Sequence, residues 1–224
     1  ISLSGLDAFA GVGASLNTEK DDIVTNGALG FLIEGGSVAV AIVKPGSPTD
    51  TRSFTGLEIG LSGAELVGLG DDFRFIASGS VLINTTSVVD DPRVNWYAAT
   101  NSTNDPADLL PAFSESLTSA VSLQIDGAVA LDIFGVVVGT ASFSIKQGTG
   151  DITGGAISLT DASVMSISLT DVDLFAGIGG GLDEPDEPDI GDISQYSVNT
   201  DGAFGFEIQG GSVKLAIVKP KPTV

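Results

Sequence analysis

Carboxylates are the side chains most able to do chemistry in this sequence, which has 29 Asp and Glu, nine Lys and Arg, no His and no Cys. Six of the ten residues in the stretch DEPDEPDIGD, Asp183 to Asp192, are acidic. Ca²⁺ takes oxygen ligands of this kind. The alternative is a solvated loop stiffened by its two prolines, because the EF-hand spacing is missing. The candidate calcium ligands are Asp183, Glu184, Asp186, Glu187, Asp189 and Asp192.

The second candidate site is the long segment from Ser87 to Phe113, which contains Trp96, the only Trp, together with Tyr97 and Arg93. Long loops are often functional, and an aromatic pair beside polar side chains can bind a surface glycan. The favoured alternative is that this segment covers the sheet or contacts another subunit. Because it lies outside the alternating strands, Trp96→Ala is expected to leave the fold intact.

Paired carboxylates are the remaining acid–base chemistry in a chain without His. Asp71–Asp72, Asp90–Asp91 and Glu115 are available, but nothing in the sequence places two of them across a cleft. We therefore expect that the chain is not an enzyme, and a carboxylate-based hydrolase is the third-ranked function. Asn84 and Asn101 each begin an Asn-x-Thr pattern, which matters only in a eukaryotic secretory route.

Net charge and composition exclude several classes of partner and cofactor. The net charge of −20 argues against nucleic acid, whose phosphates need clustered Lys and Arg, and against an anionic membrane surface. Without Cys or His, disulfides and the usual zinc ligands are excluded. No apolar run is long enough for a transmembrane helix, so no membrane insertion is expected. The expected cofactor is either none or calcium.

The elements that must position these residues are repeated within the chain. Thr25–Pro45 matches Thr200–Pro220 at 15 of 21 positions, and Ile1–Leu16 matches Ile167–Leu182 at nine of 16. Between the two blocks, NTEKDDIV in the first copy becomes DEPDEPDIGDISQYSVN in the second. The interpretation is one full unit, residues 1–166, followed by the start of a second copy, residues 167–224.

Apolar and polar residues alternate with a period of two, which predicts half-buried antiparallel strands. In SLQIDGAVALDIF the apolar residues are Leu123, Ile125, Val129, Leu131 and Ile133, and these are expected to point into the core. The opposite positions of the strands are small, which suits either water or a closely packed second layer. The fold is therefore predicted to be all-β, with long antiparallel strands in an elongated sandwich or solenoid-like stack. A closed β-barrel is the alternative.

The parity of the apolar positions changes inside the repeated block. Phe31 and Ile33 are odd-numbered, whereas Val38 and Val40 are even-numbered. A one-residue slip of this kind predicts a β-bulge at Gly35–Gly36, and the second copy predicts another at Gly210–Gly211. Helix signals are scarce. Asp105–Val121 is the best candidate, and Pro111 limits it to one or two turns.

Repetition, acidity, the absence of Cys and the Gly-, Ser-, Thr- and Asp-rich strands resemble the repeat regions of large secreted bacterial surface proteins and adhesins. The resemblance is one of composition and repetition over the whole chain. It implies an extracellular or cell-surface location and a structural repeat of a stalk or filament, often stiffened by calcium. Neighbouring copies, associating end to end, are the expected partners. The alternative function is a carbohydrate- or surface-binding module that uses the Trp96 loop.

Overall fold

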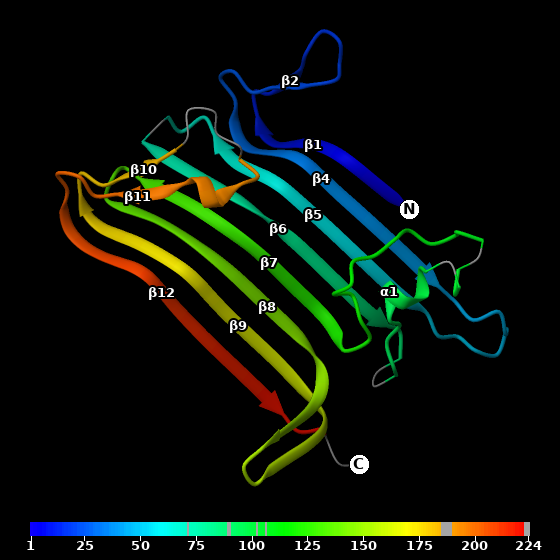
Figure 1. Cartoon of the computed structure of the whole chain (residues 1–224). Coiled ribbons are helices and arrows are strands. Elements are labelled where there is room, and N and C mark those ends of the chain that lie inside the picture. Colours follow the sequence, from blue (N-terminus) through cyan, green and yellow to red (C-terminus); the bar gives the residue numbers. More distant parts are fainter. Residues whose placement is uncertain (71, 89–90, 102, 106, 185–189, 222–224) are drawn as a thin grey trace.

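The computed structural model describes residues 1–70, 72–88, 91–101, 103–105, 107–184 and 190–221. The fold is all-β, as predicted, and most of it is one large antiparallel sheet (Figure 1). The strands of this sheet are β1 (Ser2–Val12), β4 (Leu29–Val43), β5 (Phe54–Val67), β6 (Phe73–Thr86), β7 (Val121–Ile133), β8 (Val137–Gly154), β9 (Ile157–Ile178) and β12 (Phe204–Lys219). The minor elements are β2 (Ser15–Leu16), β3 (Ile23–Val24), α1 (Trp96–Ala99), β10 (Gly181–Asp183), the 3₁₀ turn Ile193–Gln195 and β11 (Ser197–Asn199).

The large sheet is a meander with the order β1-β4-β5-β6-β7-β8-β9-β12. Each described strand pairs antiparallel with its neighbours, and β1 and β12 lie at opposite ends (Figure 1). The sheet is therefore open rather than closed into a barrel. Two small ladders, β2–β3 and β10–β11, flank it. Among the described residues, no helix is long and apolar enough to span a membrane.

One face of the large sheet, here called the apolar face, carries aliphatic side chains across all eight strands. The pairing register connects a single row of these residues from edge to edge, because each is the partner of the next. Directly paired residues share a face of the sheet, whereas the pleat places successive residues of one strand on opposite faces. The row consists of Leu3, Val38, Ile59, Val81, Ile125, Ile145, Ile167 and Leu215.

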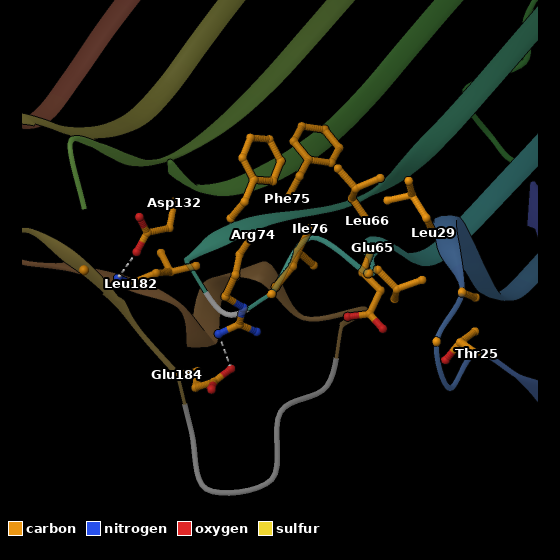
Figure 2. A pocket seen from close by; sticks show the side chains of 17 residues that line it. Thr25, Leu29, Glu65, Leu66, Arg74, Phe75, Ile76, Asp132, Leu182 and Glu184 are labelled. Carbon is orange, nitrogen blue, oxygen red and sulfur yellow. Dashed lines mark hydrogen bonds and ion pairs between the residues drawn. The ribbon is translucent and has the colours of Figure 1, made fainter. Parts of the chain in front are cut away.

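The opposite face, here called the charged face, carries the charged side chains of the paired strands together with many Ser and Ala residues. Figure 2 shows the division at one place, where Phe75 and Leu66 point to one side and Arg74 and Glu65 to the other. Lys219, the last residue of β12, is the paired charge that falls on the apolar face. The charged residues of the charged face are Glu34, Glu58, Glu65, Arg74, Asp126, Asp132, Lys146, Asp173, Glu207 and Lys214.

Two segments cover parts of the charged face. The first cover comes from the described residues between 91 and 119, and its Trp96, Phe113 and Leu117 pack on Ala41 and Leu82. The second cover comes from residues 181–184 and 190–199, and its Ile193 and Tyr196 pack on the sheet. Small residues under the covers let the second layer approach closely, which is one of the two uses expected for them. The buried sheet residues beneath the second cover are Ile76 and Ala130.

The expected direction of burial is wrong. Ile125 and Leu131 were predicted to point into the core, yet they lie on the apolar face, which no described segment covers, and both remain partly exposed. The buried residues of the same strand are Gln124, Ala130 and Asp132 on the charged face. The period of two correctly predicts that successive side chains lie on opposite faces of the strand. It does not predict which of the two faces is covered by a second layer.

The expected helix is also displaced. The described residues from 107 to 120 form turns and irregular chain, and the α-helical turn α1 lies before Asp105 instead. Asn95 caps it by accepting a hydrogen bond from the N–H of Ala98 at 3.0 Å. The carboxylate of Asp105 instead accepts from the N–H of Leu110 at 2.7 Å, which holds a loop.

Candidate functional site: the two equivalent ends of the sheet

The two repeated blocks form the same hairpin at the two ends of the sheet (Figure 1). In the first copy β1 pairs with β4, matching Leu3 with Val38 and Val12 with Leu29. In the second copy β9 pairs with β12, and the same register matches Leu169 with Val213 and Ile178 with Phe204. The small ladders repeat too, since β2 pairs with β3 as β10 pairs with β11. The sequence repeat is therefore a repeat of backbone pairing.

Both hairpins contain the same interruption. The register shifts on either side of Gly36 in the first copy and of Gly211 in the second. The residues before them, Gly35 and Gly210, have φ values of 65° and 61°, which L side chains rarely adopt. The pairings consequently place Ile33 and Val38 on the same face in spite of their opposite parity.

An aspartate holds each interruption in place. Oδ1 of Asp7 accepts a hydrogen bond from the N–H of Gly35 at 2.8 Å, and Oδ1 of Asp173 accepts from the N–H of Gly210 at 2.7 Å. The N–H groups that the ladder leaves unpaired at the two shifts thus gain charged acceptors. The repeated sequence signal is the pattern Asp-x-Phe-Ala-Gly, which occurs in both of the matched blocks Ile1–Leu16 and Ile167–Leu182.

The same pattern also supplies an aromatic ring over a pair of facing glycines. Gly11 faces Gly30 under the ring of Phe9, and Gly177 faces Gly205 next to the ring of Phe175. A Cβ atom at any of these four glycines would clash with the facing backbone and the ring. Each hairpin is therefore built with the same packing device as well as the same register.

The equivalence shows which strand pairing each free edge lacks in this chain. β1 has a free outer edge, and its counterpart β9 pairs on that side with β8. β12 also has a free outer edge, and its counterpart β4 pairs there with β5 over 12 residue pairs, from Gly30–Val67 to Val43–Phe54. The edge of β1 thus lacks the pairing that β9 makes with β8, and the edge of β12 lacks the pairing that β4 makes with β5.

The two copies differ on the charged face. Leu32 and Ala39 of β4 correspond to Glu207 and Lys214 of β12. Leu32 is buried and Ala39 packs against the first cover, whereas Glu207 and Lys214 are exposed. The backbone pairing is therefore repeated, but the apolar contact with the cover is not.

The described residues of the acidic stretch between the repeated blocks, 183–184 and 190–192, are part of the second cover. Its nine additional residues bring Ile190, Ile193 and Tyr196, which join the cluster around Ile76 and Ala130. The shorter link in the first copy, which contains Glu19 and Asp22, forms no such cluster in the described chain. The insertion therefore covers the middle of the sheet.

The described acidic residues of this stretch have partners within the chain. Asp183 accepts from the amide of Asn199 at 2.8 Å, and Glu184 forms an ion pair with Arg74 at 2.5 Å (Figure 2). Asp192 accepts from the side chain of Ser194 and from Gln195, hydrogen bonds that lower its pKa. Asp186, Glu187 and Asp189 lie outside the described residues. No group of three potential metal ligands occurs in the described part of the chain, and calcium binding stays a prediction.

Trp96 is a core residue of the first cover. Its side chain is 0% exposed, lies over Gly56 and contacts Phe113 with ring centroids 5.5 Å apart. Its Nε1–H donates to Oδ1 of Asn84 at 3.0 Å. The indole therefore presents no open face to a glycan, and its burial predicts that Trp96→Ala lowers stability, whereas the sequence predicted that it would leave the fold intact.

Asn84 is a structural residue that sequence reasoning placed only in a glycosylation pattern. It is 0% exposed, and its Nδ2 donates to the carbonyl of Val94 at 2.7 Å and to that of Thr118 at 2.9 Å. It therefore ties both ends of the first cover to β6. Buried as it is, its amide is closed to modification in the folded chain.

Arg93 and Tyr97 point to different partners from Trp96. Arg93 donates from Nη1 to the carbonyl of Ser119 and to Thr149, each at 3.3 Å, and burial lowers its pKa. Tyr97 is 47% exposed and donates to Glu115 at 3.0 Å, a hydrogen bond that raises the pKa of the phenol. These three residues do not converge on one ligand site.

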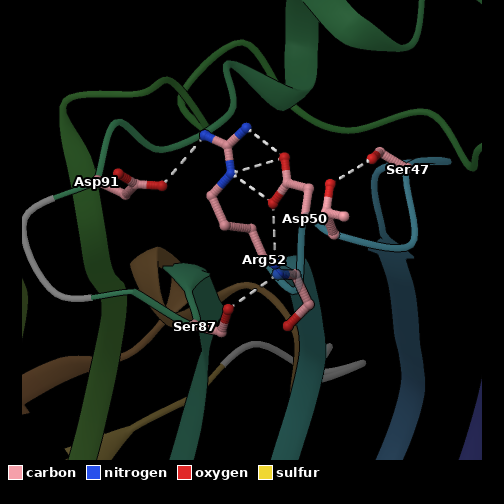
Figure 3. A network of polar contacts seen from close by, with 7 residues as sticks. Ser47, Asp50, Arg52, Ser87 and Asp91 are labelled. Carbon is pink, nitrogen blue, oxygen red and sulfur yellow. Dashed lines mark hydrogen bonds and ion pairs between the residues drawn. The ribbon is translucent and has the colours of Figure 1, made fainter.

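The candidate catalytic carboxylates that the structure describes are not gathered at one site either. Asp71 and Asp90 lie outside the described residues, and Glu115 accepts from Tyr97. Asp91 joins a surface network in which Arg52 binds Asp50 at 2.7 Å and Asp91 at 3.3 Å (Figure 3). The network links the β4–β5 connection to the start of the first cover.

This network makes a testable prediction about pH. Side-chain hydrogen bonds from Arg52, with a further backbone hydrogen bond, hold the pKa of Asp50 below its ordinary value of 3.8. Since the folded pKa is depressed, the pair stabilises the fold above the unfolded pKa, and this contribution is lost as the pH falls through the folded pKa. In Arg52→Gln, an NMR titration should show the pKa of Asp50 returning towards 3.8. Arg74→Gln, which removes the partner of Glu184, is the control and should leave the pKa of Asp50 unchanged.

A pocket of about 870 Å³ lies where the second cover meets β5 and β6 (Figure 2). Arg74 in its wall is paired with Glu184, and Asp132 accepts from the N–H groups of Gly135 and Leu182. These ion-pair and hydrogen-bond contacts hold the second cover on the sheet, so Arg74 and Asp132 already have partners within the fold.

The chain matches no known protein-family model, and no curated protein or solved structure is similar to it.

Proposed function

We propose that this chain is a structural repeat unit of an extracellular surface protein, stalk or filament, whose units join end to end by continuing one sheet. The observation that supports this most directly is the occurrence of the same interrupted hairpin, in the same register, at both ends of the sheet. In repeat proteins each unit buries its terminal elements against its neighbour. The acidic, Cys-free composition is what suggests the extracellular setting.

In this proposal, β12 of one unit occupies the place of β4 in the next, and a β5-type strand pairs with its outer edge. Eight strands minus the repeated pair leave six strands per unit. Strands are about 4.8 Å apart, so each further unit lengthens the sheet by about 29 Å. A free edge would otherwise be open to pairing with unrelated chains.

The amide of Ala216 tests this continuation. The N–H of Val40 donates to the carbonyl of Ile1, so it points towards β1. Because successive N–H groups alternate, that of Ala41 points towards β5, and that of its counterpart Ala216 points to the free edge of β12. A two-unit chain, made by joining residues 1–219 directly to a second 45–224, should slow hydrogen exchange at Ala216 by at least about 100-fold.

Ala216→Pro provides the matched comparison. In the single chain it removes a donor that faces solvent and should change stability little, because edge strands tolerate Pro. In the two-unit chain the same substitution should remove a ladder hydrogen bond of a central strand and leave the facing carbonyl unpaired, which should cost about 1–3 kcal/mol in urea unfolding. The proposal is contradicted if Ala216 exchanges equally fast in both chains, or if scattering shows no growth in length.

A further inference from the structure

We infer that two copies of this chain pack apolar face against apolar face as a closed dimer, forming a two-sheet sandwich. This interface uses the face of the sheet rather than its edges, so it is independent of the end-to-end function proposed above.

The inference begins with exposure. Ile59, Val81, Ile125, Ile145 and Ile167 form the middle of the aliphatic row, and each remains partly exposed, whereas Ala41, Leu82, Ile76 and Ala130 under the covers are only 0–6% exposed. Towards the ends of the sheet the exposure rises further, and Leu215 is 49% exposed. In the described chain both covers lie on the charged face, so the apolar side chains have no second layer.

The extent of the face matches a stable dimer. Eight strands about 4.8 Å apart and about 13 residues long, at about 3.3 Å per residue, give an area of about 1,600 Å². A typical monomer exposes no apolar patch above about 600 Å², and a specific complex buries about 800 Å² on each partner. Sheets pack face to face at about 10 Å with their side chains interdigitating, which suits rows of Val, Ile and Leu.

Charge favours a second copy over other occupants. The charged residues that have a register partner in the large sheet lie on the opposite face, apart from Lys219 at the end of β12. Two apolar faces can therefore meet while the acidic side chains of both copies stay in water. Among the described residues that have a register partner, the interior of this face also offers no charged side chain that could hold the headgroup of a lipid or fatty acid.

Sedimentation of the full chain tests the dimer. A mass of 45 kDa, twice 22.5 kDa, is expected at micromolar concentration. Ile125→Asp, at the centre of the row, should raise the dimer Kd by more than about 100-fold, because it places an unpaired carboxylate from each copy in a dry interface. The control is Ser166→Asp on the charged face, where Lys146 is the cross-strand neighbour, and its Kd should change less than about threefold.

Ile125→Thr is the second variant, for use if Ile125→Asp does not fold, because it keeps a β-branched side chain. It should raise the dimer Kd by about 30-fold. Circular dichroism checks the fold of each variant. A monomeric wild type overturns the inference, and a monomer that binds palmitate stoichiometrically would assign the face to alkyl chains instead. A dimer that is insensitive to both Ile125 variants but lost in Ala216→Pro would be an edge contact and would equally overturn it.

Discussion

Trp96→Ala is expected to lower the free energy of unfolding by about 3–5 kcal/mol, the usual range for truncating a buried Trp. The side chain is completely buried against Gly56 and Phe113, so the substitution leaves a cavity under the first cover. It also removes the donor to Oδ1 of Asn84, which is itself fully buried. Urea unfolding followed by circular dichroism measures the loss.

Tyr97→Ala is the control for this experiment. Tyr97 is the next residue in the same helical turn, but it is 47% exposed and its hydroxyl bonds to Glu115 at the surface. Its truncation should cost no more than about 1 kcal/mol. Equal losses for the two variants would show that the first cover is held by something other than burial of the indole.

Asn84→Asp should cost about 3 kcal/mol or more, although the two side chains have nearly the same shape. The substitution replaces two N–H donors with a carboxylate that faces the carbonyls of Val94 and Thr118 in a fully buried site. The same urea unfolding experiment measures it. Because the first cover is fastened at this residue, proteolysis between residues 91 and 119 should also accelerate.

The second copy supplies a natural control for Asn84→Asp. Asn26 is exposed in the turn before β4, and the equivalent position of the second copy is Asp201. Asn26→Asp should therefore change stability by less than about 0.5 kcal/mol. A similarly small effect at Asn84 would mean that its hydrogen bonds are not needed to hold the cover.

The two large effects should not add. Trp96 and Asn84 share a hydrogen bond of 3.0 Å, so the double variant should lose less stability than the sum of the single losses. The difference measures how strongly the first cover acts as one unit with β6.

The sequence by itself determined the strands and the repeat. Alternation around Leu123 and Ile125 needs only the period of the pleat, and the parity change between Ile33 and Val38 needs only a one-residue slip. Both are local properties of the chain. The equivalence of the two hairpins likewise followed from comparing the residues of the two blocks, since similar residues in similar order favour the same pairing.

Only the tertiary structure decided which face of the sheet is covered. Whether Ile125 or Ala130 is buried depends on where residues 91–119 and 190–199 fold back, and no periodicity in β7 contains that information. The sequence made Trp96 a candidate binding residue because it lies in a long loop. In the structure its indole N–H donates to Asn84, 12 residues earlier, and the side chain is part of the core. Calcium binding by the acidic stretch stays a prediction, since the sequence shows only the number of its carboxylates. Its apolar residues Ile190 and Ile193 gain their role only where the fold places Ile76 beneath them, because packing is a property of neighbours in space.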